Sequence, residues 1–371
     1  MAGIYVHIPF CKSRCIYCDF YSTTQNENLQ DKYVDRLCEE LTARQDYLPT
    51  KQISTIYLGG GTPSTLSQHN IERLLKHIFN LYKLQNYCET TIECNPNDIR
   101  KDILTNWHNF GINRISFGVQ TFDNSQLHFL HRRHTAEEAI QAIEEAKKCF
   151  DNISVDLIYG LPNQTLEMLD KDIDQILKLD IQHVSTYCLT YEEGTQLYKL
   201  KEEEKVAELD DDTLNLMYDR IIERLGKSSF EHYEVSNFCR PNFHSRHNMS
   251  YWTGEPYLGI GAAAHSFDGL NRQANEADLK NYLNGVQKVI KDPLNTTDRY
   301  NETIMLQLRT AKGIDLNKLK EQYGIEQYTY CITQAKSDIE QNNLIIENNF
   351  LRINKHGWHL LDAITQRLIT V

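Results

Sequence analysis

The sequence predicts an α/β protein in which residues 1–226 form a partial (β/α)6 barrel, followed by a small helical module with a hairpin. Six β-rich runs alternate with helical segments in this part of the chain, the order typical of a parallel sheet with helices outside. Polar and glycine motifs stand where the runs end, and barrels gather their chemistry on the loops at the carboxyl ends of the strands. This placement favours a partial TIM-like barrel over an open doubly wound sheet, which the alternation alone also allows.

The strand–helix units follow one another in a regular order. The first strand is expected at residues 3–8, a short apolar run that leads directly into a cysteine-rich loop. Short runs rich in apolar and β-branched residues predict the other strands, at residues 53–58, 90–95, 113–120, 153–160 and 183–189. The intervening segments predict helices, at residues 31–47, 68–83, 96–109, 135–149 and 165–178, with further helical material to residue 226.

The remaining chain divides into two further segments. Residues 227–268 are rich in aromatic, histidine and asparagine residues, and residues 269–295 are polar with an amphipathic piece. We expect residues 227–295 to complete the barrel. Residues 296–371 are expected to form a winged-helix-like domain, because short helices accompany a hairpin that turns at Asn348 and Asn349. The helices of this domain are predicted at residues 300–309, 315–323, 327–341 and 356–368, and the hairpin at residues 344–354.

Composition narrows the class of protein. Of the 371 residues, 40% are apolar and 24% are charged, which is typical of a globular protein with a sizeable core. The net charge of −12, without a basic tract, argues against a nucleic-acid partner. The sequence has no apolar run of about 18 residues and no signal peptide at its start, so we expect a cytoplasmic protein. Seven cysteines are then expected to be ordinary reduced thiols: Cys38, Cys88, Cys94, Cys149, Cys188, Cys239 and Cys331.

Three cysteines, Cys11, Cys15 and Cys18, stand close together in the loop after the first strand. Iron–sulfur loops use such short spacings, and three thiolates leave one iron of a 4Fe-4S cluster open to an outside ligand. A zinc site would need a fourth ligand, for which His7 is available but poorly placed. A disulfide would leave one cysteine unpaired and is typical of a secreted chain. The pattern therefore favours a cluster.

Several strand ends carry residues that are unusual in an apolar run. The second predicted strand ends in the segment 59–63, with the sequence GGGTP, which permits close approach of the backbone to a ligand or forms a plain tight turn. Glu93 lies near the end of the third strand, where a buried carboxylate is costly unless a cation pairs with it, and where a solvated glutamate is the alternative. Gln120 and Asp156 are placed similarly on the next two strands.

The residues Tyr5–Phe20, with the sequence YVHIPFCKSRCIYCDF, resemble the radical S-adenosylmethionine (SAM) superfamily. The similarity covers nearly the whole chain and points to the branch with oxygen-independent coproporphyrinogen III oxidases and HemW-type heme chaperones. It implies that SAM chelates the open iron and that a donor such as flavodoxin or ferredoxin reduces the cluster. It also implies SAM contacts from Tyr5, Tyr17, Gly60, Gly61, Thr62, Glu93, Gln120, Arg132 and Asp156. In the pair that follows His131, the resemblance places Arg132, rather than Arg133, opposite the SAM carboxylate.

Two departures and one motif distinguish the branches. The oxidases carry a fourth cysteine two residues after the third, where this chain has Phe20, and an N-terminal extension for which the ten residues before Cys11 leave no room. Residues 247–252 fit the HNxxYW motif of the HemW group. The resemblance makes His247 a candidate heme-iron ligand and Tyr251 and Trp252 candidate porphyrin contacts, with a hydrogen-bonded histidine in an aromatic loop as the alternative. Other histidine candidates are His128, His131, His134, His244 and His265.

The resemblance therefore implies a heme chaperone of the radical SAM type that carries a 4Fe-4S cluster and SAM. It implies heme and heme-acceptor proteins, respiratory proteins among them, as partners, with contact at a membrane surface and no nucleic acid. One alternative is an enzyme, the oxygen-independent oxidase that converts coproporphyrinogen III into protoporphyrinogen IX. Another is a winged-helix regulator with a redox-sensing cluster, which the acidic charge disfavours.

Overall fold

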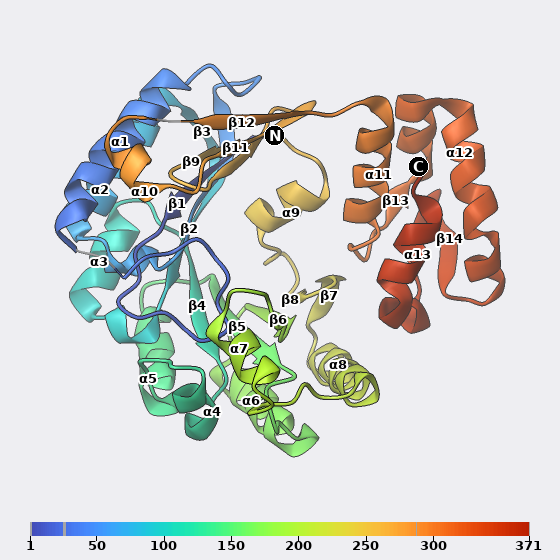
Figure 1. Ribbon diagram of the computed structural model, residues 1–371, viewed down its shortest axis with the longest axis horizontal. Helices are drawn as coiled ribbons and strands as arrows, with labels where there is room; N and C mark the ends of the chain where they lie inside the picture. The colour runs from blue at the N-terminus through green and yellow to red at the C-terminus, as the bar shows by residue number, and fades with distance from the viewer. Residues whose placement is uncertain (1, 25–26, 287, 371) are drawn as a thin grey trace.

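The computed structural model describes residues 2–24, 27–286 and 288–370. Figure 1 shows a large α/β body, with the C-terminal helices grouped at one side of it. Within the described residues, twelve strands form one sheet in the order β12-β11-β10-β9-β1-β2-β3-β4-β5-β6-β8-β7. The N-terminal strand β1 is therefore an interior strand, and the cysteine loop that follows it begins inside the sheet.

The first six strands are parallel and adjacent in sequence order, so the predicted parallel core is confirmed. Most of their aliphatic side chains are buried, as expected for strands covered on both faces, whereas Leu84, Tyr87 and Tyr187 are exposed. The strands are β1 (Gly3–Ile8), β2 (Gln52–Gly60), β3 (Lys83–Cys94), β4 (Arg114–Gln120), β5 (Ile153–Tyr159) and β6 (His183–Cys188).

The helices between these strands form because apolar residues recur on one face and polar side chains cap their N-termini. Ser67, Thr135 and Thr165 each accept a backbone N–H of the first turn. The main helices are α1 (Gln30–Ala43), α2 (Gln68–Leu81), α3 (Lys101–Asn109), α5 (Ala136–Ala146), α6 (Leu166–Leu179) and α8 (Asp211–Lys227). Shorter pieces are η1 (Glu27–Leu29), η2 (Pro63–Thr65), η3 (Pro96–Asp98), α4 (Asn124–Phe129) and α7 (Gln196–Glu202).

The segment predicted to complete the barrel extends both edges of the parallel core. β8 pairs antiparallel with β6, whereas β9 pairs parallel with β1 on the other side and leads into an antiparallel ribbon. The elements are β7 (Glu231–Glu234), β8 (Asn237–Cys239), α9 (Arg246–Trp252), β9 (Tyr257–Ile260), β10 (His265–Phe267), β11 (Asn271–Asn275), α10 (Leu279–Leu283) and β12 (Val289–Pro293).

A buried carboxylate ties this ribbon to the first helix. Glu40 on α1 accepts hydrogen bonds from the backbone N–H of Gly261 (2.9 Å), the hydroxyl of Tyr282 (2.7 Å) and the amide of Asn275 (2.8 Å). Arg44, one turn later, neutralises its charge at 2.9 Å. Elements that are more than 200 residues apart in the chain are thereby fixed to each other.

The C-terminal region forms its own core around a three-stranded sheet with the order β13-β15-β14. The predicted turn at Asn348 and Asn349 is present, and both residues have positive φ. A break at Gly324 (φ 85°, ψ 175°) divides the helix that was predicted as two pieces. The elements are α11 (Thr296–Gln307), β13 (Ile314–Asp315), α12 (Leu316–Glu340), β14 (Leu344–Glu347), β15 (Phe350–Ile353), η4 (Lys355–Leu360) and α13 (Leu361–Leu368).

No helix in the described part of the chain has both the length and the apolar character to cross a membrane.

Glu234, at the end of β7, connects the α/β body to the C-terminal region, because its backbone forms an isolated antiparallel β-bridge with Thr310. Its side chain is fully buried. Burial raises the pKa of Glu234 to about 7. An unfolded glutamate ionises well below that pH. The free energy of unfolding therefore falls as pH rises from 5 to 7, because the unfolded chain loses this proton more readily than the folded chain does. Glutamine cannot ionise, so the free energy of unfolding of Glu234→Gln should not show this fall. We expect the difference between variant and wild type to change by about 2 kcal/mol in favour of the variant from pH 5 to pH 7. Urea unfolding at both pH values measures the difference, and the exposed Glu192→Gln should show none.

Candidate functional site

The loop that carries Cys11, Cys15 and Cys18 is held at both ends and in its middle. The backbone N–H of Cys11 donates to Thr23 at 2.9 Å. Ile16, between the cysteines, is buried in a small apolar cluster, and its backbone bonds to both Leu130 and Leu197. The other members of that cluster are Ile158, Leu161 and Leu189, so the loop is anchored on the ends of β5 and β6.

All three cysteines line one cavity of about 490 Å³, here called the thiol cavity. The cavity lies beyond the carboxyl ends of the parallel strands, where the sequence predicted the chemistry. It is also lined by most of the residues predicted to contact SAM, namely Tyr17, Gly60, Gly61, Thr62, Glu93, Gln120, Arg132 and Asp156. The structure therefore brings together residues that are separated by more than 140 positions in the chain.

Hydrogen-bond donors surround the sulfur atoms. The hydroxyl of Thr62 donates to Cys11 Sγ at 3.4 Å, and Arg132 Nη1 donates to Cys15 Sγ at 3.2 Å. Burial raises the pKa of Cys18 to about 11 and also raises the pKa of Cys11. These two thiols therefore keep their protons at neutral pH, and iron binding would displace those protons. Cys94 and Cys188 also line the cavity, but they lie on the strands β3 and β6 and not in the cysteine loop. Three sulfurs from one loop, with nearby donors, fit a cluster with one open iron.

Glu93 lies across the thiol cavity. Its carboxylate accepts hydrogen bonds from the hydroxyl of Tyr57 (2.8 Å) and the backbone N–H of Gly60 (3.1 Å). Burial, with a contribution from Asp156, raises the pKa of Glu93 to about 7. Its carboxyl group is therefore partly ionised near neutral pH, and a neighbouring ligand group can change its charge. A cationic or hydrogen-bond-donating group placed there would be stabilised by it.

Backbone geometry opens space beside the cysteines. A Cβ on Gly61 would lie 2.9 Å from the carbonyl oxygen of Ile8, so only glycine permits the segment after β2 to approach the end of β1 this closely. Gln120 has φ 76° at a bulge in β4, which directs the end of that strand toward the cavity. Asp156 accepts a hydrogen bond from Ser116 at 3.3 Å, and burial raises its pKa.

The two adjacent arginines have different partners. Arg133 Nη2 binds both oxygens of Asp98, at 3.1 and 3.2 Å, in a network that also contains Lys12 and Ser64. Arg132 bonds to Cys15 and to the carbonyl of Gly118, and its ε-nitrogen finds no partner among the described residues. Arg132 is thus the arginine with hydrogen-bonding capacity left for a ligand.

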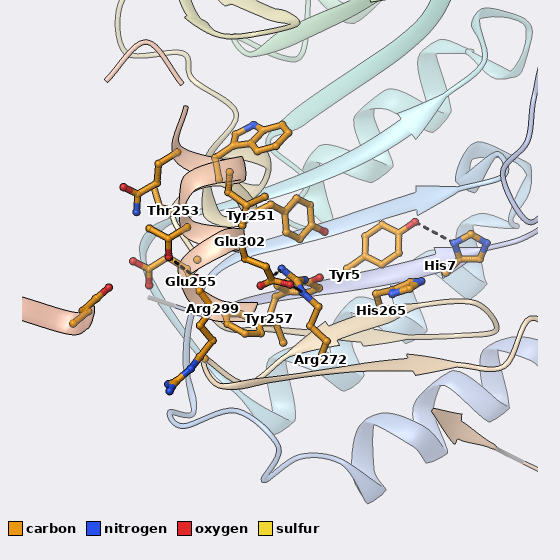
Figure 2. Close-up of a pocket in the computed structure, with 18 of the residues that line it drawn as sticks. Tyr5, His7, Tyr251, Thr253, Glu255, Tyr257, His265, Arg272, Arg299 and Glu302 are labelled. Atoms are coloured by element: carbon orange, nitrogen blue, oxygen red, sulfur yellow. Dashed lines mark hydrogen bonds and ion pairs between the residues drawn. The ribbon is translucent and has the colours of Figure 1, made fainter. Parts of the chain in front are cut away.

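A second cavity, of about 710 Å³, lies between the sheet and the C-terminal region, and we call it the interdomain cavity (Figure 2). Tyr5 lines this cavity and does not line the thiol cavity, although it was predicted among the SAM contacts. Tyr251 and Trp252 line it as well. The two cavities share Asp19, Phe20, Gly60 and Glu93, so they adjoin.

The HNxxYW motif forms the short helix α9, and its histidine is locked in place. His247 is 1% exposed, and its two ring nitrogens bond to the hydroxyls of Thr55 and Tyr251, both at 2.8 Å. Its ring stacks on Tyr57, with centroids 5.0 Å apart. Iron could bind His247 only after one of these hydrogen bonds was broken, and the ligand role of His247 stays a prediction.

The other candidate histidines are dispersed. His134 is buried and bonds to the carbonyl of Val119, His131 lines the thiol cavity, and His244 pairs with Glu231 at 3.3 Å. His128 lies on α4 and lines neither cavity, whereas His265 lines the interdomain cavity.

Sequence reasoning missed several lining residues. Tyr187, at the end of β6, lines the thiol cavity, and its position at the end of the sixth strand was a signal that could have identified it. Arg272, Arg299, Glu302 and Lys318 line the interdomain cavity from β11, α11 and α12. They carried no local signal, because their positions depend on how the C-terminal region packs.

Comparisons with known proteins agree with this architecture. Residues 5–176 match the model of the radical SAM superfamily, and residues 294–360 match that of the HemN C-terminal domain. The solved structure described as "Coproporphyrinogen III oxidase (HemN) from Escherichia coli is a Radical SAM enzyme" superposes with a TM-score of 0.85 at 21% identity, covering 100% of this chain and 90% of that chain. That likeness establishes the fold.

The fold and the three-cysteine cavity thus define a radical SAM protein. The chain is 33% identical to the heme chaperone HemW of Lactococcus lactis, over 98% of this chain and 96% of that protein. It is also 33% identical to the heme chaperone HemW of Bacillus subtilis, over 87% of each. The chain belongs to the HemW family of the radical SAM superfamily.

Proposed function

We propose that this protein is a heme chaperone that binds heme and passes it to acceptor proteins, respiratory proteins among them, and that it carries a SAM-ligated 4Fe-4S cluster. The observation that carries the proposal is the similarity, over nearly the whole chain, to proteins named heme chaperone HemW. The presence of Phe20 where the oxidase pattern has a fourth cysteine supports the chaperone over the oxidase.

The thiol cavity supplies the groups that such a cofactor pair requires. Cys11, Cys15 and Cys18 would hold the cluster, which when bound supplies one-electron reduction of SAM. Glu93 would accept hydrogen bonds from the amino group of SAM, and Arg132 would face its carboxylate. The backbone around Gly61 would lie against the ligand, and a donor such as flavodoxin or ferredoxin would reduce the cluster.

Heme transfer is tested with the reconstituted full chain under anaerobic conditions. Titration with hemin should shift the Soret band and saturate at about one heme per chain. Mixing the complex with a heme-free b-type cytochrome should transfer heme at a rate that rises with cytochrome concentration, as direct handover requires. A wild-type protein that leaves the hemin spectrum unchanged would contradict the proposal.

The oxidase alternative has its own assay. Incubation with SAM, a reductant and coproporphyrinogen III should leave that substrate unchanged if the protein is a chaperone. Formation of protoporphyrinogen IX would instead identify an oxidase, and a known oxidase in the same buffer serves as the positive control.

A further inference from the structure

Three histidines lie in or beside the interdomain cavity, and they differ in what their ring nitrogens contact. His7 bonds through one nitrogen to the hydroxyl of Tyr5 (3.1 Å) and through the other to the carbonyl of Tyr21 (2.9 Å). His247 likewise uses both nitrogens. Across the described residues, neither nitrogen of the exposed His265 has a hydrogen-bond or ion-pair partner. Since iron needs a free nitrogen lone pair, only His265 offers one without rearrangement.

The tight turn between β9 and β10 positions His265. A Cβ on Gly259 would lie 1.9 Å from the carbonyl oxygen of His265, so glycine is required for β9 and β10 to approach this closely. Gly261, with φ 100°, completes the turn, and the backbone of His265 pairs with Ala274. The imidazole therefore projects from a paired strand, which is a rigid support for a ligand to a metal.

Cations line the cavity on the C-terminal side. Arg272 is already neutralised by Glu302, through bonds of 2.6 and 3.0 Å. The side chains of Arg299 on α11 and Lys318 on α12 have no carboxylate partner in the described part of the chain. Arg299 Nη2 donates to the hydroxyl of Thr296 at 3.4 Å, and its buried ε-nitrogen finds no hydrogen-bond acceptor. Figure 2 shows His265 and Arg299 well apart, with Arg272 and Glu302 between them.

The walls and the size suit a flat aromatic ligand. Tyr251 and Tyr257 meet edge to face, with centroids 4.7 Å apart, and Trp252 and Phe267 extend this aromatic surface. A volume of about 710 Å³ lies within the usual range for cavities that enclose a cofactor-sized molecule. Aromatic side chains bury large apolar rings favourably, which a porphyrin provides.

We propose that heme occupies the interdomain cavity, with His265 as the iron ligand and with Arg299 and Lys318 binding the heme carboxylates. This inference rests on the proposed function and specifies its site. Heme would then lie next to the thiol cavity, because the two cavities adjoin. Phe20, which is 65% exposed, lines both of them and would lie between heme and the cysteines. The motif histidine His247 is then a positioning residue that holds Tyr251 against the ligand.

Hemin titration of four proteins tests the iron ligand: wild type, His265→Ala, His247→Ala and His69→Ala, in which the histidine is exposed on α2. We expect His265→Ala to bind hemin roughly tenfold more weakly. Its Soret and electron paramagnetic resonance spectra should lose the imidazole signature and regain it when free imidazole is added. His247→Ala and His69→Ala should keep that signature, and circular dichroism verifies that each variant is folded.

The carboxylate contacts are tested by comparing hemin with hemin dimethyl ester. Replacing Arg299 and Lys318 together by glutamine should weaken hemin binding roughly tenfold while leaving the affinity for the ester unchanged. Equal losses for both ligands would overturn this part of the inference.

The possible failures are distinguishable. If the wild-type protein does not bind hemin, the proposed function is wrong. If it binds hemin and His265→Ala retains the wild-type spectrum, or if folded His247→Ala alone loses the imidazole signature, the function stands and the assignment of His265 is wrong.

Discussion

The Cys15→Ser variant should lose the iron–sulfur cluster, and after anaerobic reconstitution it should retain less than about one iron per chain where the wild type retains roughly four. Cys15 contributes one of the three sulfurs in the thiol cavity, and Arg132 donates to it at 3.2 Å. A serine hydroxyl is a poor ligand for iron, so the variant would keep two thiolates, too few to hold the cluster. Iron and sulfide analysis, with spectra of the reduced protein, measures the loss.

Cys149→Ser is the matched control. Cys149 is a partly buried thiol that lines neither cavity, so its replacement should leave the iron content unchanged. A Cys15→Ser protein with a full cluster would refute the assignment of Cys15, and a wild-type protein without iron after careful reconstitution would refute the cluster itself.

The second large effect concerns Glu93. In the cluster-loaded protein, Glu93→Gln should weaken SAM binding at least about tenfold, since a charged hydrogen bond is replaced by a neutral one. Because the pKa of Glu93 is about 7, its carboxylate is mostly charged at pH 8 and mostly protonated at pH 6. The ratio of wild-type to variant affinity should therefore fall by up to about tenfold between pH 8 and pH 6.

Equilibrium dialysis with labelled SAM measures both affinities. The ratio removes the titration of SAM itself, because both proteins bind the same ligand. The exposed Glu192→Gln should match the wild type at both pH values. A ratio that stays constant with pH would show that the charge of Glu93 does not contribute to SAM binding.

The parallel core was predictable because its signals are local. Runs such as Ile153–Tyr159 are buried on both faces and read as strands without tertiary information. Boundaries were less accurate where side-chain caps decide them. The helix predicted from residue 96 begins at Lys101, because Asn95 caps a separate short turn at Pro96–Asp98.

The edges of the sheet could not be predicted in the same way. β8 and β10 have only three residues each, too few to show an alternating pattern, and they are strands because a neighbour pairs with them. The continuation of the sheet beside β1 depends on the approach of Gly259 to His265, which no local spacing reveals.

The residues of the candidate site also fall into two groups: those that their position in the sequence could place, and those that depend on tertiary packing. The cysteines follow β1, and Glu93 is the last residue but one of β3, so sequence position was enough to place them at one end of the sheet. Asp156 was expected near the end of its strand and lies in the middle of β5, yet it lines the same cavity. Tyr5 lies on β1 and lines the interdomain cavity. The sequence could not predict this position, because that cavity forms only when the C-terminal region packs against the sheet. Arg299 and Lys318 depend on that packing entirely, which is why reasoning from the sequence concentrated on the HNxxYW motif.

The interior position of β1 protects the cysteine loop that follows it. Four strands lie on one side of β1 and seven on the other, within the described chain. Local unfolding that begins at either edge of the sheet must separate several hydrogen-bonded strands before it reaches β1 (Gly3–Ile8). Opening of the outer ribbon β10–β12 would therefore leave β1, and the cysteine loop that follows it, in place.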